Sequence, residues 1–144
     1  MITGFNHTSF TVSNMDRSVY YYSDVIGLEL ISLADRPIEY VERVTKVENG
    51  MRVAYLKGYG VTLELIEYVG SAKHSSKSSV DNIGSGHICF NVDNLEEIVN
   101  ILGKKGIKFL GNPTTIPAGT NRGGYIVYAL DPDGIATEFI QPPK

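Results

Sequence analysis

The chain has 144 residues, of which 42% are hydrophobic and 20% are charged, and this composition excludes a disordered chain or a coiled coil. With 13 Lys and Arg against 16 Asp and Glu, the net charge is −3, so the chain lacks the basic excess that is typical of nucleic-acid-binding proteins. The sequence shows neither an apolar run near the ~20 residues that cross a bilayer nor a signal peptide. Its single cysteine, Cys89, fits a reducing compartment. We therefore expect a cytoplasmic protein that binds neither nucleic acid nor membrane.

The first recognisable element recurs later in the chain. Residues 5–13 and 85–93 both alternate between polar and apolar side chains, and they align with His7 opposite His87. Alternation with period two is typical of a strand. The sequence therefore contains an internal near-repeat, which we expect to fold as two similar modules.

A helical pattern follows each of these strands. Apolar residues recur at helical spacing over residues 15–26 in the first copy and 95–102 in the second. Three further strands are expected in each copy, at 28–33, 51–57 and 61–68 in the first and at 107–110, 124–130 and 135–141 in the second. Both copies thus have the order β-α-β-β-β, and the predicted fold class is α+β.

The two copies set the domain organisation. Module 1–70 and module 84–144 are joined by a polar linker, 70–84, in which we interpret His74 as solvated. Residues 34–50 form a polar insertion whose structure the pattern does not specify. We expect the modules to form one domain over 1–144.

Alternation along the strands places the two histidines away from the apolar face that the helices should cover. The last strand of each copy carries a carboxylate in its middle, Glu64 and Glu138, among apolar residues. An ionised carboxylate in such surroundings is costly unless it is paired or bound to a cation. Two histidines and two glutamates at matching places of two copies therefore predict the ligands of one divalent metal ion.

Structural interpretations of these residues compete with the metal site. A single strand histidine is usually hydrogen-bonded or exposed, and Glu64 alone would suit a solvent-facing strand position. We interpret Glu67 as an exposed strand residue and Cys89 as a half-buried thiol rather than a nucleophile. The matching positions of the four residues in the repeat favour the metal site over a structural quartet.

The paired β-α-β-β-β pattern resembles the vicinal oxygen chelate superfamily, which includes glyoxalase I, methylmalonyl-CoA epimerase, extradiol dioxygenases, and fosfomycin and bleomycin resistance proteins. The stretches that carry the resemblance are Asp24-Val25-Ile26-Gly27-Leu28, Leu63-Glu64-Leu65, Gly86-His87-Ile88 and Asp131-Pro132-Asp133-Gly134. The resemblance implies that the two modules curl into an open barrel around the metal. It also implies a homodimer.

Residue by residue, the resemblance assigns the four metal ligands to His7, Glu64, His87 and Glu138, with Zn, Ni, Co, Mn or Fe as the divalent ion. Bacterial glyoxalase I has this set of ligands. The epimerases usually have Gln at the position of Glu64 and often a second His at that of Gly86. The resemblance therefore covers a glyoxalase I-like and an epimerase-like branch.

Two positions depart from glyoxalase I. Glyoxalase I tends to carry Arg at the position of Thr11 and Asn at the position of Tyr68. These differences argue against a substrate that is bound through glutathione. The Gly- and Pro-containing loop over residues 116–124 carries Arg122, a candidate ligand for a substrate carboxylate or phosphate.

These residues favour a metal-dependent lyase or isomerase that acts on a small substrate with adjacent oxygens through a metal-stabilised enolate or enediolate. Glu64 and Glu138 are the candidate catalytic bases. Two alternatives stay open: an extradiol-type ring-cleaving dioxygenase that uses His7, His87 and Glu138, and a metal-free protein that binds a small molecule, as bleomycin resistance proteins do. The fourth ligand, Glu64, favours the lyase or isomerase because dioxygen chemistry needs open coordination positions.

Overall fold

A computed structural model describes residues 1–70 and 79–144. The chain divides into two compact units, residues 1–75 and 76–144. Each has the α+β composition that the repeat predicts. His74 and the central part of the predicted linker lie outside the described residues. No helix in the described part of the chain is long and apolar enough to cross a membrane.

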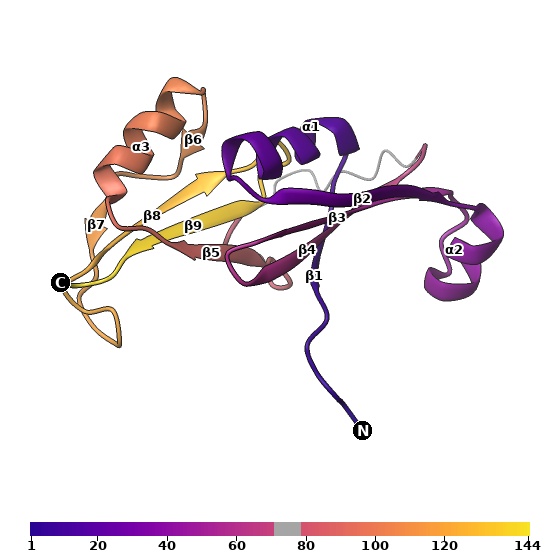
Figure 1. The fold of residues 1–144 in the computed structure, drawn as a ribbon, viewed down its shortest axis with the longest axis horizontal. Helices are drawn as coiled ribbons and strands as arrows, with labels where there is room; N and C mark the ends of the chain where they lie inside the picture. Colours follow the sequence, from indigo (N-terminus) through magenta and orange to yellow (C-terminus); the bar gives the residue numbers. More distant parts are fainter. Residues whose placement is uncertain (71–78) are drawn as a thin grey trace. The chain divides into compact units, whose positions relative to one another are not determined.

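Unit 1 contains a four-stranded sheet with the order β1-β4-β3-β2, which is labelled in Figure 1. Its elements are β1 (Thr8–Thr11), α1 (Met15–Tyr20), the π-helical turn η1 (Tyr21–Val25), β2 (Glu29–Arg36), α2 (Ile38–Thr45), β3 (Met51–Gly58) and β4 (Val61–Tyr68). Strand β1 pairs with β4 in parallel, whereas the other neighbours are antiparallel.

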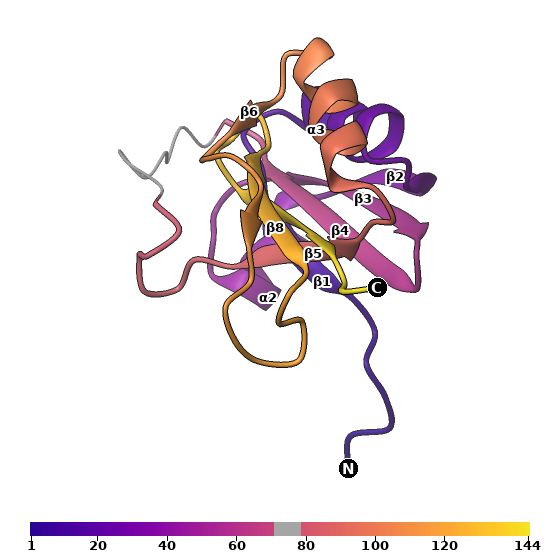
Figure 2. The ribbon, with the colours of Figure 1, turned by 90° about the vertical axis from the view of Figure 1, so that its left-hand side faces the viewer.

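Unit 2 repeats this arrangement with the order β5-β9-β8-β6, and a short strand, β7, also pairs with β8. Its elements are β5 (His87–Asn91), α3 (Leu95–Lys104), β6 (Lys108–Phe109), β7 (Thr114–Thr115), β8 (Tyr125–Leu130) and β9 (Ala136–Gln141). Here β5 and β9 are the parallel pair. Figure 2 shows α3 on one side of strands β8 and β9, which it contacts. The predicted strands are confirmed in both units, and β7 was not predicted.

The first helix of each unit begins in the same way. The side chains of Asn14 and Asn94 each accept a hydrogen bond from a backbone N–H in the first turn, as residues at this position commonly do. In unit 1 the helix continues as η1, where the N–H of Ile26 donates to the carbonyl of Tyr21 across five residues at 3.0 Å. The adjacent side chains of Tyr21 and Tyr22, which begin this wider turn, are both buried.

The side of the sheet that receives this helix is the predicted one. The ring of Phe10 on β1 contacts the ring of Tyr22, with centroids 6.2 Å apart. In the register of the parallel pair, Phe10 lies opposite Leu65 and Ser9 lies opposite Glu64. Since neighbouring residues on a strand point to opposite faces, Glu64 lies on the face away from α1.

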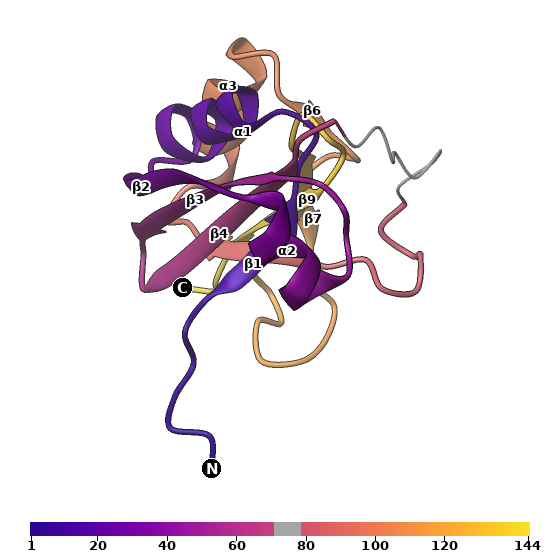
Figure 3. The same cartoon turned by 90° about the vertical axis from the view of Figure 1, so that its right-hand side faces the viewer.

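The polar insertion over residues 34–50 contains a helix that the sequence pattern did not specify. Strand β2 extends to Arg36, and α2 follows after Pro37 and ends at Lys46, which has a left-handed backbone. The buried side chain of Val41 packs with Met51 and Val53. Helix α2 therefore covers one end of the sheet face that carries Glu64 (Figure 3).

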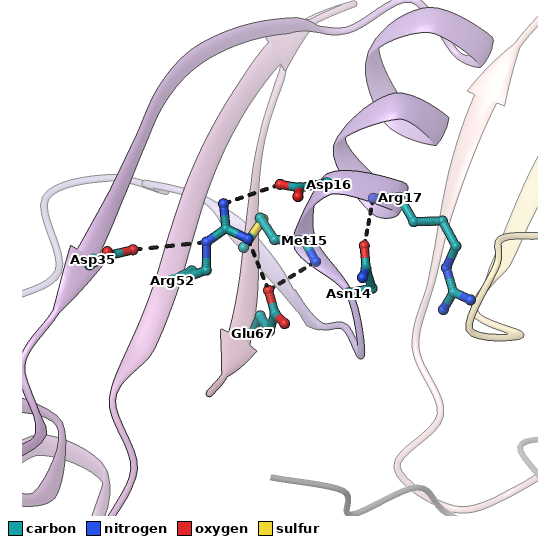
Figure 4. Close-up of polar contacts among 7 residues, drawn as sticks. All are labelled: Asn14, Met15, Asp16, Arg17, Asp35, Arg52 and Glu67. Atoms are coloured by element: carbon teal, nitrogen blue, oxygen red, sulfur yellow. Dashed lines mark hydrogen bonds and ion pairs between the residues drawn. The ribbon is translucent and has the colours of Figure 1, made fainter. Parts of the chain in front are cut away.

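Our interpretation of Glu67 as an exposed strand residue was wrong. Its Oε2 accepts a hydrogen bond of 3.0 Å from the backbone N–H of Met15 and lies 3.5 Å from the Arg52 guanidinium, as Figure 4 shows. Arg52 also pairs with Asp16 at 3.1 Å and lies 3.9 Å from Asp35. A carboxylate at a helix N-terminus is favoured by the exposed N–H groups there. Glu67 thus joins the start of α1 to the end of β4.

Unit 2 makes the same connection without a charge. The side-chain Oε1 of Gln141 accepts a 2.8 Å hydrogen bond from the backbone N–H of Leu95 at the start of α3. Gln141 lies opposite Tyr125 in the register, where Glu67 lies opposite Arg52. An oxygen acceptor at this place is therefore common to both units, whereas the ion pair belongs to unit 1.

Substitutions at Glu67 separate these two contributions. Glu67→Gln keeps the acceptor and loses only a partly exposed ion pair, so we expect the free energy of unfolding to fall by less than about 1 kcal/mol. Glu67→Ala leaves the Met15 N–H without its acceptor and should cost about 1–3 kcal/mol. Urea denaturation of both variants measures the difference. Equal losses would show that the ion pair, rather than the acceptor, holds the helix to the strand.

Candidate functional site

In unit 1 the sheet face away from α1 carries a cluster of three side chains. His7 directly precedes β1, Tyr55 lies on β3 and Glu64 lies on β4 between them. Nε2 of His7 is 3.3 Å from Oε2 of Glu64, and the Tyr55 hydroxyl donates a 2.5 Å hydrogen bond to Oε1 of the same carboxylate. The rings of His7 and Tyr55 meet edge to face with centroids 5.6 Å apart. His7 and Glu64, two of the four predicted metal ligands, thus lie together within this unit.

The orientation of His7 favours a cation at this place. Its Nδ1 lies 2.7 Å from Oδ1 of Asn6, an acceptor that requires a proton on Nδ1. In the neutral ring Nε2 then carries a lone pair, which faces the Glu64 carboxylate. A proton or a metal ion between Nε2 and Oε2 removes the repulsion of these two acceptors, and metal-bound histidines commonly have such a hydrogen bond on their other nitrogen.

Unit 2 carries the same three residue types at equivalent places. Nε2 of His87 is 2.8 Å from Oε2 of Glu138, and the Tyr128 hydroxyl donates a 2.9 Å hydrogen bond to that oxygen. The rings of His87 and Tyr128 meet edge to face at 5.4 Å. Each unit therefore contains what we call a His–Glu–Tyr trio, His7–Glu64–Tyr55 in unit 1 and His87–Glu138–Tyr128 in unit 2.

The carboxylates change the ionisation of their tyrosine partners. The hydrogen bond to Glu64, followed by burial, raises the pKa of Tyr55. Burial, followed by the hydrogen bond to Glu138, raises the pKa of Tyr128 to about 12. Both hydroxyls therefore stay protonated near neutral pH and act as hydrogen-bond donors. Glu138 is only 6% exposed, and Tyr128 is a neutral hydrogen-bond donor to it.

Sequence analysis missed both tyrosines. They lie 9 and 10 residues before their glutamates, and the antiparallel register of β3 with β4 and of β8 with β9 brings each pair directly opposite. The detectable signal was a tyrosine at the same place in each predicted hairpin. It required the register of the hairpins, which depends on their turns.

Each unit brings together one of the predicted histidines and one of the predicted glutamates. Within residues 1–70 and 79–144, no group of three or more His, Cys, Asp or Glu side chains is gathered. An imidazole and a carboxylate are ligand types that zinc and related divalent ions accept. Each unit therefore provides two residues that suit a metal ion, one histidine and one glutamate. A complete set of four ligands remains a prediction.

Three residues that the sequence analysis related to the substrate, Arg122, Thr11 and Tyr68, lie outside the His–Glu–Tyr trios. Arg122 is exposed in the turns between β7 and β8, where its backbone N–H donates to the carbonyl of Gly119. Thr11 ends β1 and Tyr68 ends β4. Tyr68 packs against the cluster of Val41, Met51 and Val53 under α2, so its side chain takes part in the support of the sheet.

Cys89 lies on β5 opposite Glu138 in the parallel register. Partial burial, together with the nearby Glu138 carboxylate, raises the pKa of its thiol to about 11. A thiol of raised pKa is a poor nucleophile near neutral pH because the thiolate is the reactive form. This supports the interpretation of Cys89 as a non-nucleophilic thiol, whereas the expectation that it is half-buried was wrong, because the residue as a whole is exposed.

Two β-α-β-β-β units, each with a histidine next to a glutamate, define the class of the protein. The chain belongs to the Glyoxalase/Bleomycin resistance protein/Dioxygenase superfamily, whose family profile matches residues 4–139. The resemblance inferred from the sequence is thereby confirmed.

Characterised relatives carry two kinds of enzyme name. The chain is 29% identical over 144 residues to a 2-epi-5-epi-valiolone epimerase from an Actinomyces species, covering 96% of this chain and 79% of that protein. It is 30% identical over 149 residues to a lactoylglutathione lyase from Pseudomonas aeruginosa, covering 95% and 81% of the two chains. The distant relatives of the chain are therefore enzymes, and they include both a lyase and an epimerase.

Solved structures show the same fold. A glyoxalase family protein from Bacillus cereus superposes with a TM-score of 0.81 at 20% identity, covering 100% of this chain and 97% of that one. A variant of glyoxalase I from Zea mays gives 0.68 at 24% identity, where the match covers 96% of this chain and 44% of that one. The predicted α+β glyoxalase fold is confirmed, and the curled open barrel stays a prediction.

The raised pKa of Cys89 has a measurable consequence. At pH 8 we expect iodoacetamide to alkylate the native protein at least about 100-fold more slowly than the urea-unfolded protein, in which the thiol has its ordinary pKa near 8.5. Because the native pKa is higher, its rate should keep rising with pH above pH 9, where the unfolded rate levels off. Glu138→Gln removes the negative charge that contributes to the shift and should accelerate the native reaction. Equal rates for native and unfolded protein would contradict the shift.

Proposed function

We propose that the protein is a metal-dependent lyase or isomerase that moves a proton next to a carbonyl group of a small substrate with two adjacent oxygens. The observation that carries this proposal is the His–Glu–Tyr trio, which occurs in both units with the imidazole 3.3 and 2.8 Å from the carboxylate. Family membership and the names of the relatives, one lyase and one epimerase, support the same class of chemistry.

His7, Glu64, His87 and Glu138 would hold the metal in this proposal. The bound ion would act as a Lewis acid that stabilises the negative charge developing on the substrate oxygens as the proton leaves. The imidazoles supply neutral nitrogen ligands, and the two carboxylates balance the double positive charge of the ion. A small-molecule substrate and the homodimer that the resemblance implies belong to the same proposal.

Glu138 is the better placed of the two carboxylates to act as the base. Tyr55 and His7 engage different oxygens of Glu64, Oε1 and Oε2. The contacts of Tyr128 and His87 both fall on Oε2 of Glu138, so its Oε1 takes part in neither, and the further partner of this carboxylate is the thiol of Cys89, a weak neutral donor. A buried carboxylate with an oxygen outside these contacts can accept a substrate proton, which is the role of a general base.

His87→Ala tests the metal site. The variant loses one nitrogen ligand, and we expect metal content after purification to fall at least about tenfold. Asn91→Ala, on the same strand and face, is the matched control and should keep the metal of the parent protein. Elemental analysis measures both and identifies the ion. Zinc, nickel or cobalt agrees with the proposal, whereas iron would favour the ring-cleaving dioxygenase and equal metal in His87→Ala would refute the ligand assignment.

Glutamine variants separate metal binding from proton transfer. Gln keeps the shape of Glu and an oxygen ligand but accepts no proton. In metal-saturated protein we expect Glu138→Gln to remain slower by ~10²–10⁴, the usual cost of losing a general base. Glu64→Gln should recover most of its rate with excess metal.

Solvent deuterium uptake by candidate 2-oxo acids, acyl thioesters and hydroxyketones provides the assay for these two variants. The parent protein identifies the substrate class that exchanges, and the variants are then compared on that class with the metal at saturation. Full recovery of exchange in metal-saturated Glu138→Gln would exclude this residue as the base.

Glutathione adducts are expected to be poor substrates. Thr11 and Tyr68 occupy the positions where glyoxalase I tends to carry Arg and Asn, and Tyr68 packs under α2. Two lost polar contacts at about 1.5 kcal/mol each predict kcat/KM with methylglyoxal and glutathione at least about 100-fold below that of an authentic lactoylglutathione lyase. The Pseudomonas aeruginosa relative serves as the positive control. Comparable turnover by the two proteins would overturn this expectation.

A further inference from the structure

We propose that Tyr55 and Tyr128 are positioning residues that set the metal affinity of the site, each by holding its glutamate through a donated hydrogen bond. This inference rests on the proposed function, since it concerns the same four ligands. Neither tyrosine is a ligand, and neither is required to touch the substrate.

Each tyrosine hydroxyl restrains the orientation of its glutamate through the hydrogen bond that it donates. In unit 1 the Tyr55 hydroxyl takes Oε1 of Glu64 at 2.5 Å, so Oε2 is the oxygen turned to His7. In unit 2 the Tyr128 hydroxyl is 2.9 Å from the same Oε2 of Glu138 that faces His87. In both units the hydrogen bond limits rotation of the carboxylate about its last bond.

The tyrosine rings are themselves held in place. Each meets its histidine edge to face, at 5.6 Å in unit 1 and 5.4 Å in unit 2. Tyr55 also packs against Val41, Met51 and Val53, the cluster that α2 completes. A tyrosine supported in this way delivers its hydroxyl to a fixed point, which is what an outer partner of a metal ligand must do.

Comparison of the two units argues against a purely structural role. Three residues before each tyrosine, unit 1 has Arg52 paired with Glu67, whereas unit 2 has Tyr125 opposite Gln141. On the helix side of the sheets the two units thus share the oxygen acceptor for the helix N–H but not the ion pair. On the other face the tyrosine and its hydrogen bond to the glutamate occur in both.

Removal of a hydrogen-bonding partner from a ligand typically weakens metal binding by about 10- to 100-fold. Tyr55→Phe and Tyr128→Phe remove only the hydroxyl and keep the ring. We therefore expect each single variant to bind Co²⁺ about tenfold more weakly and the double variant to bind still more weakly. Tyr125→Phe is the matched control, because Tyr125 lies on the same strand as Tyr128, is 44% exposed and faces the other side of the sheet.

The experiment uses the full chain, stripped of metal. Calorimetric titration with Co²⁺ gives the affinity, and the visible absorption bands of the cobalt complex report the arrangement of its ligands. Thermal unfolding of the metal-free proteins shows whether the variants fold. The expected result is weaker binding and altered cobalt bands in Tyr55→Phe and Tyr128→Phe, with folded metal-free protein in each case and a parent-like Tyr125→Phe.

The possible outcomes distinguish a failure of the proposed metal site from a failure of the proposed role of the tyrosines. A parent protein that binds no Co²⁺ would overturn the metal site and this inference with it. A parent protein that binds Co²⁺, together with phenylalanine variants of unchanged affinity and spectrum, would overturn the role of the tyrosines alone. If one variant does not fold, the other decides, because each unit contains its own trio.

Discussion

Parallel pairing of the first and last strand of each unit is the constraint on which the candidate site depends. Parallel neighbours cannot be joined by a tight turn, so the chain has to cross over between them. In both units the helix and the remaining strands form that connection. The pairing places Thr8, at the start of β1, beside Leu63 near the beginning of β4, and His87, at the start of β5, beside Ala136, where β9 begins. A histidine at the beginning of a unit thereby meets a glutamate near its end.

The same pairing explains why the glutamates are tolerated in the middle of a sheet. A carboxylate loses hydration there, and this loss has to be offset by partners. Each glutamate has an imidazole at the beginning of the neighbouring parallel strand, where His7 directly precedes β1 and His87 opens β5. It also has a tyrosine hydroxyl on the neighbouring antiparallel strand. The central position of β4 and β9 in their sheets is what allows a partner on both sides. An edge strand would offer only one.

Sequence reasoning could find the two histidines and the two glutamates but not the groups that support them. Strand alternation placed His7 and His87 away from the apolar face, and the matching places of Glu64 and Glu138 in the repeat singled out the carboxylates. The structure brings one histidine and one glutamate together in each unit. Tyr55 and Tyr128 were not found because their contact depends on cross-strand register. Helix α2 was not assigned because it has a single fully buried residue, Val41, and packs on a sheet end that only the folded chain creates.

Glu67 shows a different kind of failure. Alternation along β4 puts Glu67 on the same face as Leu63 and Leu65, which is the face that α1 covers. Glu67 was nevertheless interpreted as an exposed strand residue. Its position at the strand end, where the helix begins, provides the backbone N–H that satisfies it. The position of a residue in the alternation was here a better guide than its charge.

The π-helical turn in unit 1 allows the helical segments of the two units to differ in length by one residue. From the start of the helix to the glycine that ends it, unit 1 runs from Met15 to Gly27 and unit 2 from Leu95 to Gly106, so unit 1 holds one residue more. Both glycines have left-handed backbone, with φ of 95° and 79°. The additional residue is accommodated within the widened turn at Tyr21–Val25, and the strands that follow begin in equivalent places. One additional residue in one of two similar units can thus be absorbed in a helix without a shift in the strand pairing that brings histidine and glutamate together.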